Sequence, residues 1–299
     1  MADAIQLPHW MGDVDPSQIG FPLAVDRNAY RKETGIPYKH TAQGPLLLDA
    51  YRPAAGEQHP LVVMIHGGAW ARGGRFEMGL TKWAGYLASA GMAVVSIDYR
   101  LAPATTYPDS FQDCLDAVDW AVEHADQLGA DADRVGLWGD SAGGHLVLLL
   151  ATSQTHPAFP GPRLSTGGSR LRAVVAFYPP TDLLTLDRAE RRGPAGTRTV
   201  RDFVGVEPEA DPPRWREASP IEFVHPGLPP ILLLQGTRDF LVPHWQATSF
   251  AERLTAAGAP HRLEIVESGV HGFDRVGPDD RARSLIVEAR EFLRRELAA

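Results

Sequence analysis

The chain has 299 residues, a mass of 32.6 kDa and an ordinary globular composition, with 44% apolar and 22% charged residues. Its net charge of −8 argues against nucleic acid or an anionic membrane as a partner, since both select basic surfaces. The single cysteine excludes an intrachain disulfide and fits a reducing compartment. The N-terminus has acids and prolines where a signal peptide has basic and then apolar residues, and no uncharged apolar run reaches the ~20 residues that cross a bilayer. We therefore expect a cytoplasmic globular protein without a membrane or nucleic-acid partner.

The order of apolar runs along the chain predicts an α/β fold. Residues 1–40 have no strong period, and we expect an N-terminal arm, either disordered or lying across one end of the sheet as part of a cap. Residues 41–299 are expected to form one domain, opening with an antiparallel edge strand at Leu46–Tyr51. Buried strands are then predicted at Leu61–Ile65, Ala93–Ile97, Val135–Trp138, Arg172–Phe177, Ile231–Leu234 and Leu263–Val266. The helical patterns between them cover residues 78–90, 110–127, 142–153, 244–257 and 279–297. This alternation predicts a mostly parallel sheet with helices on both faces.

Two stretches interrupt the alternation. Residues 157–170 are rich in proline, glycine and serine and are typical of a surface loop. Residues 185–220 mix charged residues with proline, and an insertion of this size near the end of a strand is commonly a lid or binding loop. We therefore predict a small lid-like insertion at residues 185–220.

The pentapeptide Gly139-Asp140-Ser141-Ala142-Gly143 matches the G-x-S-x-G pattern of a nucleophilic serine. It lies between a predicted strand and a predicted helix, where a sharp turn exposes the serine and requires glycine on either side. The alternative is a glycine-rich turn with an incidental serine. A phosphate-binding loop is rejected, because no nucleotide-binding pattern is present and Asp140 would repel phosphate. We assign Ser141 as nucleophile and Asp140 as a substrate contact.

The segment His66-Gly67-Gly68-Ala69-Trp70 follows a predicted strand and can supply an oxyanion hole. The backbone N–H groups of Gly67 and Gly68, together with that of Ala142, can stabilise the oxygen of a tetrahedral intermediate. We interpret His66 as a group that orients this loop. Trp70 is assigned to substrate binding as a wall of the acyl pocket, with ordinary packing as the alternative.

A serine nucleophile needs a base and an orienting acid, which follow it in the order acid, then histidine. His271 fits best, because it lies in a glycine turn after the last predicted strand. Asp239 follows the preceding strand, and Asp182 is the alternative acid, with a helix cap as its structural interpretation. The competing histidines are His225, His244 and His261. No spacing suggests a metal site, and no cofactor is expected.

Five ordered motifs resemble the hormone-sensitive-lipase-like branch of the α/β-hydrolases, whose bacterial members are mostly small carboxylesterases. The motifs are HGGAW at 66–70, DYRLAP at 98–103, GDSAGGHL at 139–146, RDFLVP at 238–243 and VHGF at 270–273. The resemblance covers residues 60–299 and implies the triad and oxyanion donors assigned above. One departure is Ala69, where the branch often has a further glycine. The His-Gly-Gly-x-Trp form also resembles arylformamidases and some esterases of plant-wall acyl groups.

These features together predict a serine carboxylesterase that hydrolyses a small short-chain acyl ester through an acyl-enzyme. An arylformamidase or a feruloyl- or acetyl-type esterase with the same triad is the nearest alternative. A non-catalytic small-molecule receptor on the same fold is the alternative of another class. The sequence leaves the natural substrate and the oligomeric state open, with a homodimer as one alternative.

Overall fold

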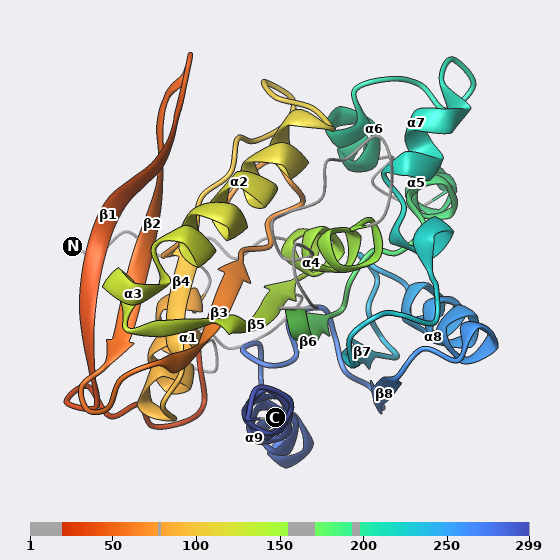
Figure 1. Cartoon of the computed structure of the whole chain (residues 1–299). Coiled ribbons are helices and arrows are strands. Elements are labelled where there is room, and N and C mark those ends of the chain that lie inside the picture. The colour runs from red at the N-terminus through yellow and green to blue at the C-terminus, as the bar shows by residue number, and fades with distance from the viewer. Residues whose placement is uncertain (1–19, 77–78, 155–170, 193–197, 299) are drawn as a thin grey trace, which may run out of the picture.

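Eight strands form one mostly parallel sheet in the computed structural model, which describes residues 20–76, 79–154, 171–192 and 198–298. The order across the sheet is β1-β2-β4-β3-β5-β6-β7-β8 (Figure 1). The strands are β1 (Tyr30–Thr41), β2 (Gly44–Pro53), β3 (His59–Ile65), β4 (Ala93–Ile97), β5 (Ala130–Asp140), β6 (Leu171–Phe177), β7 (Ile231–Gly236) and β8 (His261–Val266). The pairs β1–β2 and β2–β4 are antiparallel, and all the others are parallel. The predicted fold class is confirmed.

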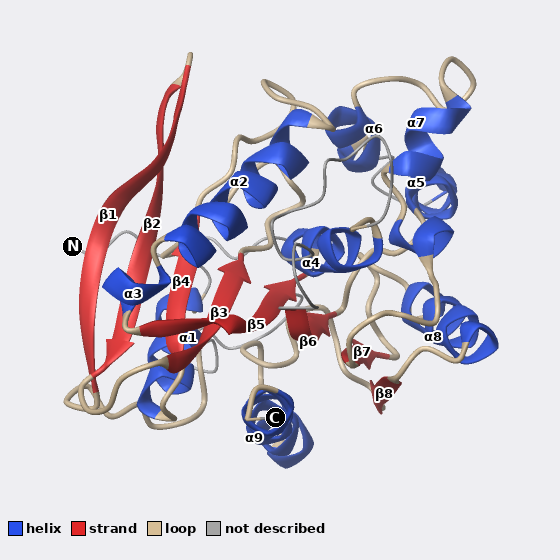
Figure 2. Cartoon of the chain, viewed as in Figure 1, coloured by secondary structure: helices blue, strands red, loops and turns tan. Residues whose placement is uncertain are grey.

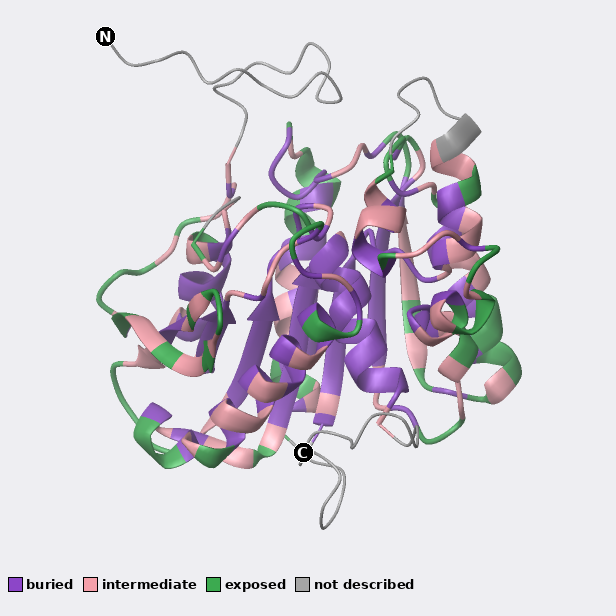
Figure 3. Ribbon diagram, turned by 90° about the horizontal axis from the view of Figure 1, so that it is seen from above, coloured by how far each residue is buried: buried purple, intermediate pink, exposed green. Residues whose placement is uncertain are grey.

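Helices cover both faces of the sheet, because the central strands are apolar on both sides (Figure 2). One face packs against α2 (Asp109–Glu123), α3 (Ala125–Leu128), α4 (Ala142–Thr152) and α8 (Trp245–Ala257). The other face packs against α1 (Leu80–Ser89) and α9 (Asp280–Glu296). Figure 3 shows buried residues following the central strands and α4. Because β3 to β8 are parallel, their carboxyl ends lie together at one end of the sheet, and the loops that follow these strands meet there.

The prediction of an N-terminal arm is wrong for residues 30–40. These residues belong to β1, which forms the outer edge of the sheet and makes β2, predicted as an edge strand, an internal one. Two register irregularities in the β1–β2 pair, between Glu33 and Ile36 and between Pro37 and Lys39, break the alternation that would have marked the strand. Residues 1–19 lie outside the described part of the chain.

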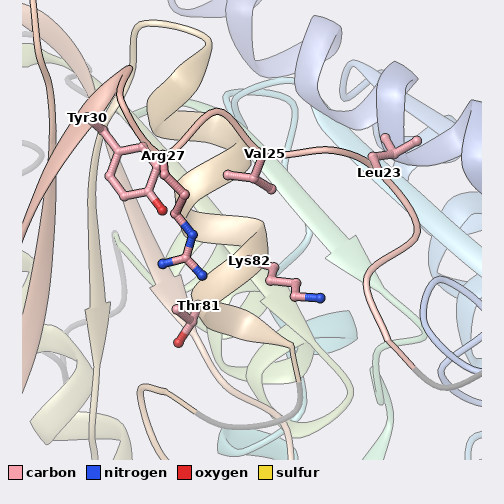
Figure 4. Close-up of a pocket in the computed structure, with 6 residues that line it drawn as sticks. All are labelled: Leu23, Val25, Arg27, Tyr30, Thr81 and Lys82. Carbon is pink, nitrogen blue, oxygen red and sulfur yellow. The ribbon is translucent and has the colours of Figure 1, made fainter. Parts of the chain in front are cut away.

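Residues 20–29 run along the outside of α1. Phe21 packs against Trp83 and Tyr86, with ring centroids 5.1 and 5.3 Å away. A pocket of about 160 Å³ lies between this segment and the start of α1 (Figure 4). It is lined by Leu23, Val25, Arg27, Tyr30, Thr81 and Lys82. These lining residues include no predicted site residue, so the pocket is separate from the site described below.

The described part of the predicted insertion at residues 185–220 is mostly helical, and its helices are referred to below as the cap. Its helices are α5 (Leu183–Arg192), α6 (Thr199–Val204) and α7 (Pro212–Glu217), followed by a short 3₁₀ turn at Pro220–Phe223. In Figure 1 these helices group together on the same side of the sheet as α4. Phe203 of α6 stacks on Trp70, with ring centroids 4.7 Å apart. The cap therefore packs directly on the loop that follows β3. The predicted loop at 157–170 lies outside the described residues.

Candidate active site

Ser141 occupies a strained turn between β5 and α4. Its φ and ψ are 52° and −120°, an unusual conformation for a residue with a side chain. A Cβ added to Gly139 would lie 2.3 Å from the carbonyl oxygen of Gly143, and one added to Gly143 would lie 2.0 Å from that of Ile65. The two glycines therefore allow the close approach that holds the serine at the edge of the sheet.

The acid and base loops are brought together by another close approach. A Cβ at Gly236, the last residue of β7, would lie 2.2 Å from the carbonyl oxygen of Gly269, and Arg238 N–H donates to that same oxygen at 2.9 Å. Asp239 and His271 follow these contacts on their respective loops. Parallel strands thus deliver the two side chains to one place, although 32 residues separate them.

The structure places the three predicted triad residues in one line of hydrogen bonds. His271 Nε2 is 3.0 Å from Ser141 Oγ, and His271 Nδ1 is 2.7 Å from Asp239 Oδ2. The Asp239 side chain is fully buried and that of His271 is 10% exposed. A proton on Nδ1 pairs with the carboxylate and leaves Nε2 to accept the serine proton. This is the arrangement that activates a serine hydroxyl.

Asp239 is held by further donors, whereas the alternative acid Asp182 has a different role. Asp239 Oδ1 accepts the N–H groups of Leu241 and Val242 at 3.0 and 2.8 Å, and Oδ2 accepts the amide of Gln235 at 3.1 Å. Asp182 precedes α5, and its Oδ1 accepts the N–H of Thr185 at 3.1 Å. Asp182 therefore caps α5, which is the structural role predicted for it as the alternative to catalysis.

Two other histidines near the site organise the backbone. His66 stacks on Tyr99, with centroids 4.4 Å apart, and its Nδ1 is 2.6 Å from the carbonyl oxygen of Gly67. His145 on α4 is fully buried, and burial lowers its pKa to about 4. Its Nε2 lies 2.7 Å from the carbonyl oxygen of Ala218, and its Nδ1 accepts the indole N–H of Trp70 at 3.2 Å. His145 therefore joins the nucleophile helix, the loop after β3 and the end of the cap.

The structure changes one predicted oxyanion donor. The N–H of Gly67 already donates to Asp140 Oδ1 at 3.1 Å, so it is not free to bind a substrate oxygen. Among the residues that the structure describes, the N–H groups of Gly68 and Ala69 have no acceptor, and that of Ala142 opens α4. Sequence reasoning missed Ala69. The sequence signal that could have found Ala69 is its position, because it stands where the related proteins often have a further glycine. Its φ of 57° lies in the region that favours glycine.

The two predicted substrate contacts are buried instead. Asp140 is 1% exposed, and its Oδ2 accepts Nη2 of Arg275 at 2.6 Å, so its carboxylate is turned into the protein. Trp70 is 2% exposed and packs between His145 and Phe203. The prediction of Asp140 as a substrate contact is wrong, because both of its oxygens have protein partners. The contacts of Trp70 match the packing alternative.

The described residues contain no group of three or more histidine, cysteine or acidic side chains that could hold a metal ion. In the same part of the chain, no helix combines the length and apolar character needed to cross a membrane.

Comparison with known proteins gives matches over most of the chain. The family model described as BD-FAE matches residues 48–254. The chain is 34% identical to esterase LipC of Mycobacterium tuberculosis over 81% of its own length and 61% of the relative. It is 31% identical to ethyl acetate hydrolase of Pseudomonas putida, covering 78% and 70%. A hyperthermophilic esterase from the archaeon Pyrobaculum calidifontis superposes with a TM-score of 0.73 at 28% identity, covering 90% and 87%.

The chain spans 54% to 61% of the length of LipC and two further mycobacterial relatives that it matches. The family match itself covers more than half of the chain, and the superposition covers nearly all of it. The same stretch contains β3, the serine turn and Asp239. The chain belongs to the BD-FAE family and is an α/β-hydrolase similar to hormone-sensitive lipase and related esterases.

Proposed function

We propose that this chain is a serine carboxylesterase that hydrolyses short acyl esters through an acyl-enzyme intermediate. The observation that carries the proposal is the line of hydrogen bonds from Ser141 Oγ through His271 to the buried carboxylate of Asp239. A base takes the proton of the serine, and a buried acid fixes the tautomer of the base. The relatives named as esterases and as an ethyl acetate hydrolase support the same reaction class.

The proposed reaction begins when Ser141 Oγ attacks the ester carbonyl carbon and His271 Nε2 takes its proton. The carbonyl oxygen becomes negative and accepts hydrogen bonds from the N–H groups of Gly68, Ala69 and Ala142. His271 then gives its proton to the leaving alkoxide, and the acyl group stays on Ser141. Water repeats the cycle with His271 as base and releases the acid. Loss of one oxyanion donor typically lowers kcat by ~10²–10³.

The cap supports a preference for short, soluble acyl groups. Arg201 on α6 pairs with Asp187 at 2.7 Å and also with Glu207, so the cap is held together by ion pairs. Phe203 is fully buried against Trp70 rather than offered to a lipid surface. Each methylene buried in a fitting pocket contributes ~0.8 kcal/mol, so an enzyme with a long acyl pocket favours long chains steeply. We propose acetyl to hexanoyl esters as the best substrates.

A panel of p-nitrophenyl esters from acetyl to dodecanoyl, with formanilides and feruloyl esters beside it, tests the proposal. We expect the highest kcat/KM among the acetyl to hexanoyl esters and no rise in rate above the solubility limit. A serine-directed phosphonate should add its mass to the peptide that contains Ser141. A kcat/KM that rises through the dodecanoyl ester would overturn the short-chain preference. Hydrolysis of formanilides faster than that of any ester would show that the enzyme is a formamidase and not an esterase. The cytoplasmic location and the oligomeric state, including a homodimer, stay predictions.

A further inference from the structure

A buried charged cluster lies beside the triad and has no part in the reaction as written above. Arg275 Nη2 donates to Asp140 Oδ2 and to the Tyr178 hydroxyl, each at 2.6 Å, and Arg275 Nε is 3.5 Å from Asp274 Oδ1. The side chains of Arg275 and Asp140 are 7% and 2% exposed. Burying a charge raises the free energy of the fold unless the charge is paired, and here one guanidinium pairs with the two carboxylates of Asp140 and Asp274.

Asp140 places one of these carboxylates against the oxyanion loop. It directly precedes Ser141, and its Oδ1 accepts the N–H of Gly67 at 3.1 Å. A Cβ on Gly67 would lie 2.7 Å from Asp140 Oδ2, which shows how closely the carboxylate approaches the loop. The next two N–H groups along the chain, those of Gly68 and Ala69, are proposed to bind the substrate oxygen. An unbalanced negative charge here would oppose the charge that develops on that oxygen.

The charge that balances Asp140 comes from the loop of the base. Arg275 lies four residues after His271, in a turn that its own N–H closes by donating to Gly272 O at 2.9 Å. Burial by itself lowers the pKa of the guanidinium, but Asp274, Tyr178 and Asp140 together raise it well above the ordinary value. Arg275 is therefore a permanent cation. Tyr178, which shares it, also packs its ring 4.5 Å from that of His271.

We propose that Arg275 is a positioning residue of the hydrolytic reaction: it holds Asp140 and offsets the negative charge of this carboxylate, which otherwise opposes the oxyanion. The inference rests on the proposed esterase function and adds a residue to its machinery. Because the opposed charge exists only in the transition state, the effect falls on kcat rather than on KM. Hydrogen bonds of Asp140 and Arg275 thus connect three loops of the site: the oxyanion loop, the serine turn and the loop of the base.

Variants at the two ends of the ion pair separate this role from a merely structural link. If the pair only tied two loops together, breaking it from either end would lower kcat equally. If it balances charge, Arg275→Met leaves an uncompensated carboxylate beside the oxyanion, whereas Asp140→Asn removes that carboxylate. We expect Arg275→Met to lower kcat about 100-fold with KM changed less than about threefold, and Asp140→Asn to lower kcat less than about fivefold.

The double variant Asp140→Asn/Arg275→Met and the conservative Arg275→Lys complete the set. The double variant should recover about tenfold in kcat over Arg275→Met, because the opposing charge is gone. Arg275→Lys should stay within about fivefold of the parent. Arg100→Met is the matched control: Arg100 also pairs with a fully buried carboxylate, Asp113, at 2.7 Å, but lies outside this cluster. We expect it to lower stability while kcat stays within about twofold.

The measurements are kcat and KM on p-nitrophenyl butyrate, the midpoint of urea unfolding, and the rate at which a phosphonate labels Ser141. Equal losses of kcat in Asp140→Asn and Arg275→Met, or a double variant no faster than Arg275→Met, would overturn the inference. If Arg275→Met does not fold, an Asp140→Asn loss of about 100-fold overturns it equally. Labelling of Ser141 without turnover of any ester would count against the proposed function, while the ratio of labelling rates would still test Arg275.

Discussion

Replacing His145 by glutamine will remove a pH-dependent part of the unfolding free energy. His145 is fully buried on α4, and its two ring nitrogens hold the indole of Trp70 and the carbonyl of Ala218 at 3.2 and 2.7 Å. The Trp70 indole can only donate, so Nδ1 must accept and the imidazole must be neutral with its proton on Nε2. Burial lowers the pKa of His145 from 6.5 to about 4.

The sign of the effect follows from where the proton binds. Between pH 6.5 and about 4, the unfolded chain binds a proton at His145 and the folded chain does not. The stabilising effect of the neutral ring is therefore fully present above pH 6.5 and is lost as the pH falls toward 4. At ~1.4 kcal/mol for each pKa unit, this amounts to roughly 2–3 kcal/mol between about pH 7.5 and about pH 4.5.

Urea unfolding followed by tryptophan fluorescence at several pH values measures this effect. Glutamine at position 145 can still donate to Ala218 and accept from Trp70, but it does not titrate. The unfolding free energy of the parent should therefore fall more steeply with decreasing pH than that of His145→Gln. His261→Gln, at the partly exposed start of β8, is the control and should follow the parent. A parent-minus-His145→Gln difference that stays constant over this range would refute the reasoning.

Three further predictions concern the proposed site directly. Ser141→Ala should keep the circular dichroism spectrum and the urea midpoint of the parent while ester turnover falls by several orders of magnitude, and retained turnover would contradict the assignment. Asp239→Asn should lower kcat by about 10⁴ because His271 takes the wrong tautomer, whereas Asp182→Asn should reduce the unfolding free energy by no more than about 1 kcal/mol because asparagine can also cap the helix, and the opposite ranking would exchange the two roles. Gly68→Ala should lose activity and stability together, since its Cβ would lie 2.0 Å from a backbone oxygen at a φ of +113°; normal urea unfolding and turnover would show that the loop relaxes freely.

The sequence predicts well what depends on local pattern. The strands β3, β4, β6 and β7 and the second half of β5 are buried apolar runs, and they are identifiable because parallel strands with covered faces lack polar alternation. The edge strand β8 is mostly half-buried and contains charged residues, so only its apolar end indicates a strand. Ser141, Asp239 and His271 were identifiable because each follows such a strand in a turn. Their order along the chain follows from the fold, so locating the strands also located the side chains at their ends.

What the sequence could not predict depends on contacts between distant segments. Asp140 and Arg275 are 135 residues apart, and no local pattern indicates that they meet. The bond from Gly67 to Asp140, which occupies a predicted oxyanion donor, spans 73 residues. The edge strand β1 could not be predicted for another reason: most of its residues are exposed or half-buried, and its pairing with β2 has two register shifts, so the sequence shows no regular alternation. Sequence patterns predict individual helices and strands, whereas the contacts of Asp140 depend on how those elements pack against one another.

The order of strands across the sheet has a consequence for how the protein is made. After β3, each new parallel strand from β5 to β8 joins the outer edge of the growing sheet, in the order in which it leaves the ribosome. A nascent chain thus presents Ser141 well before His271, which follows 130 residues later. Until the last strand docks, the serine has no base and its hydroxyl is an ordinary alcohol. Under the proposed mechanism, a chain that ends before β8 lacks His271, and we therefore expect it to be inactive toward esters.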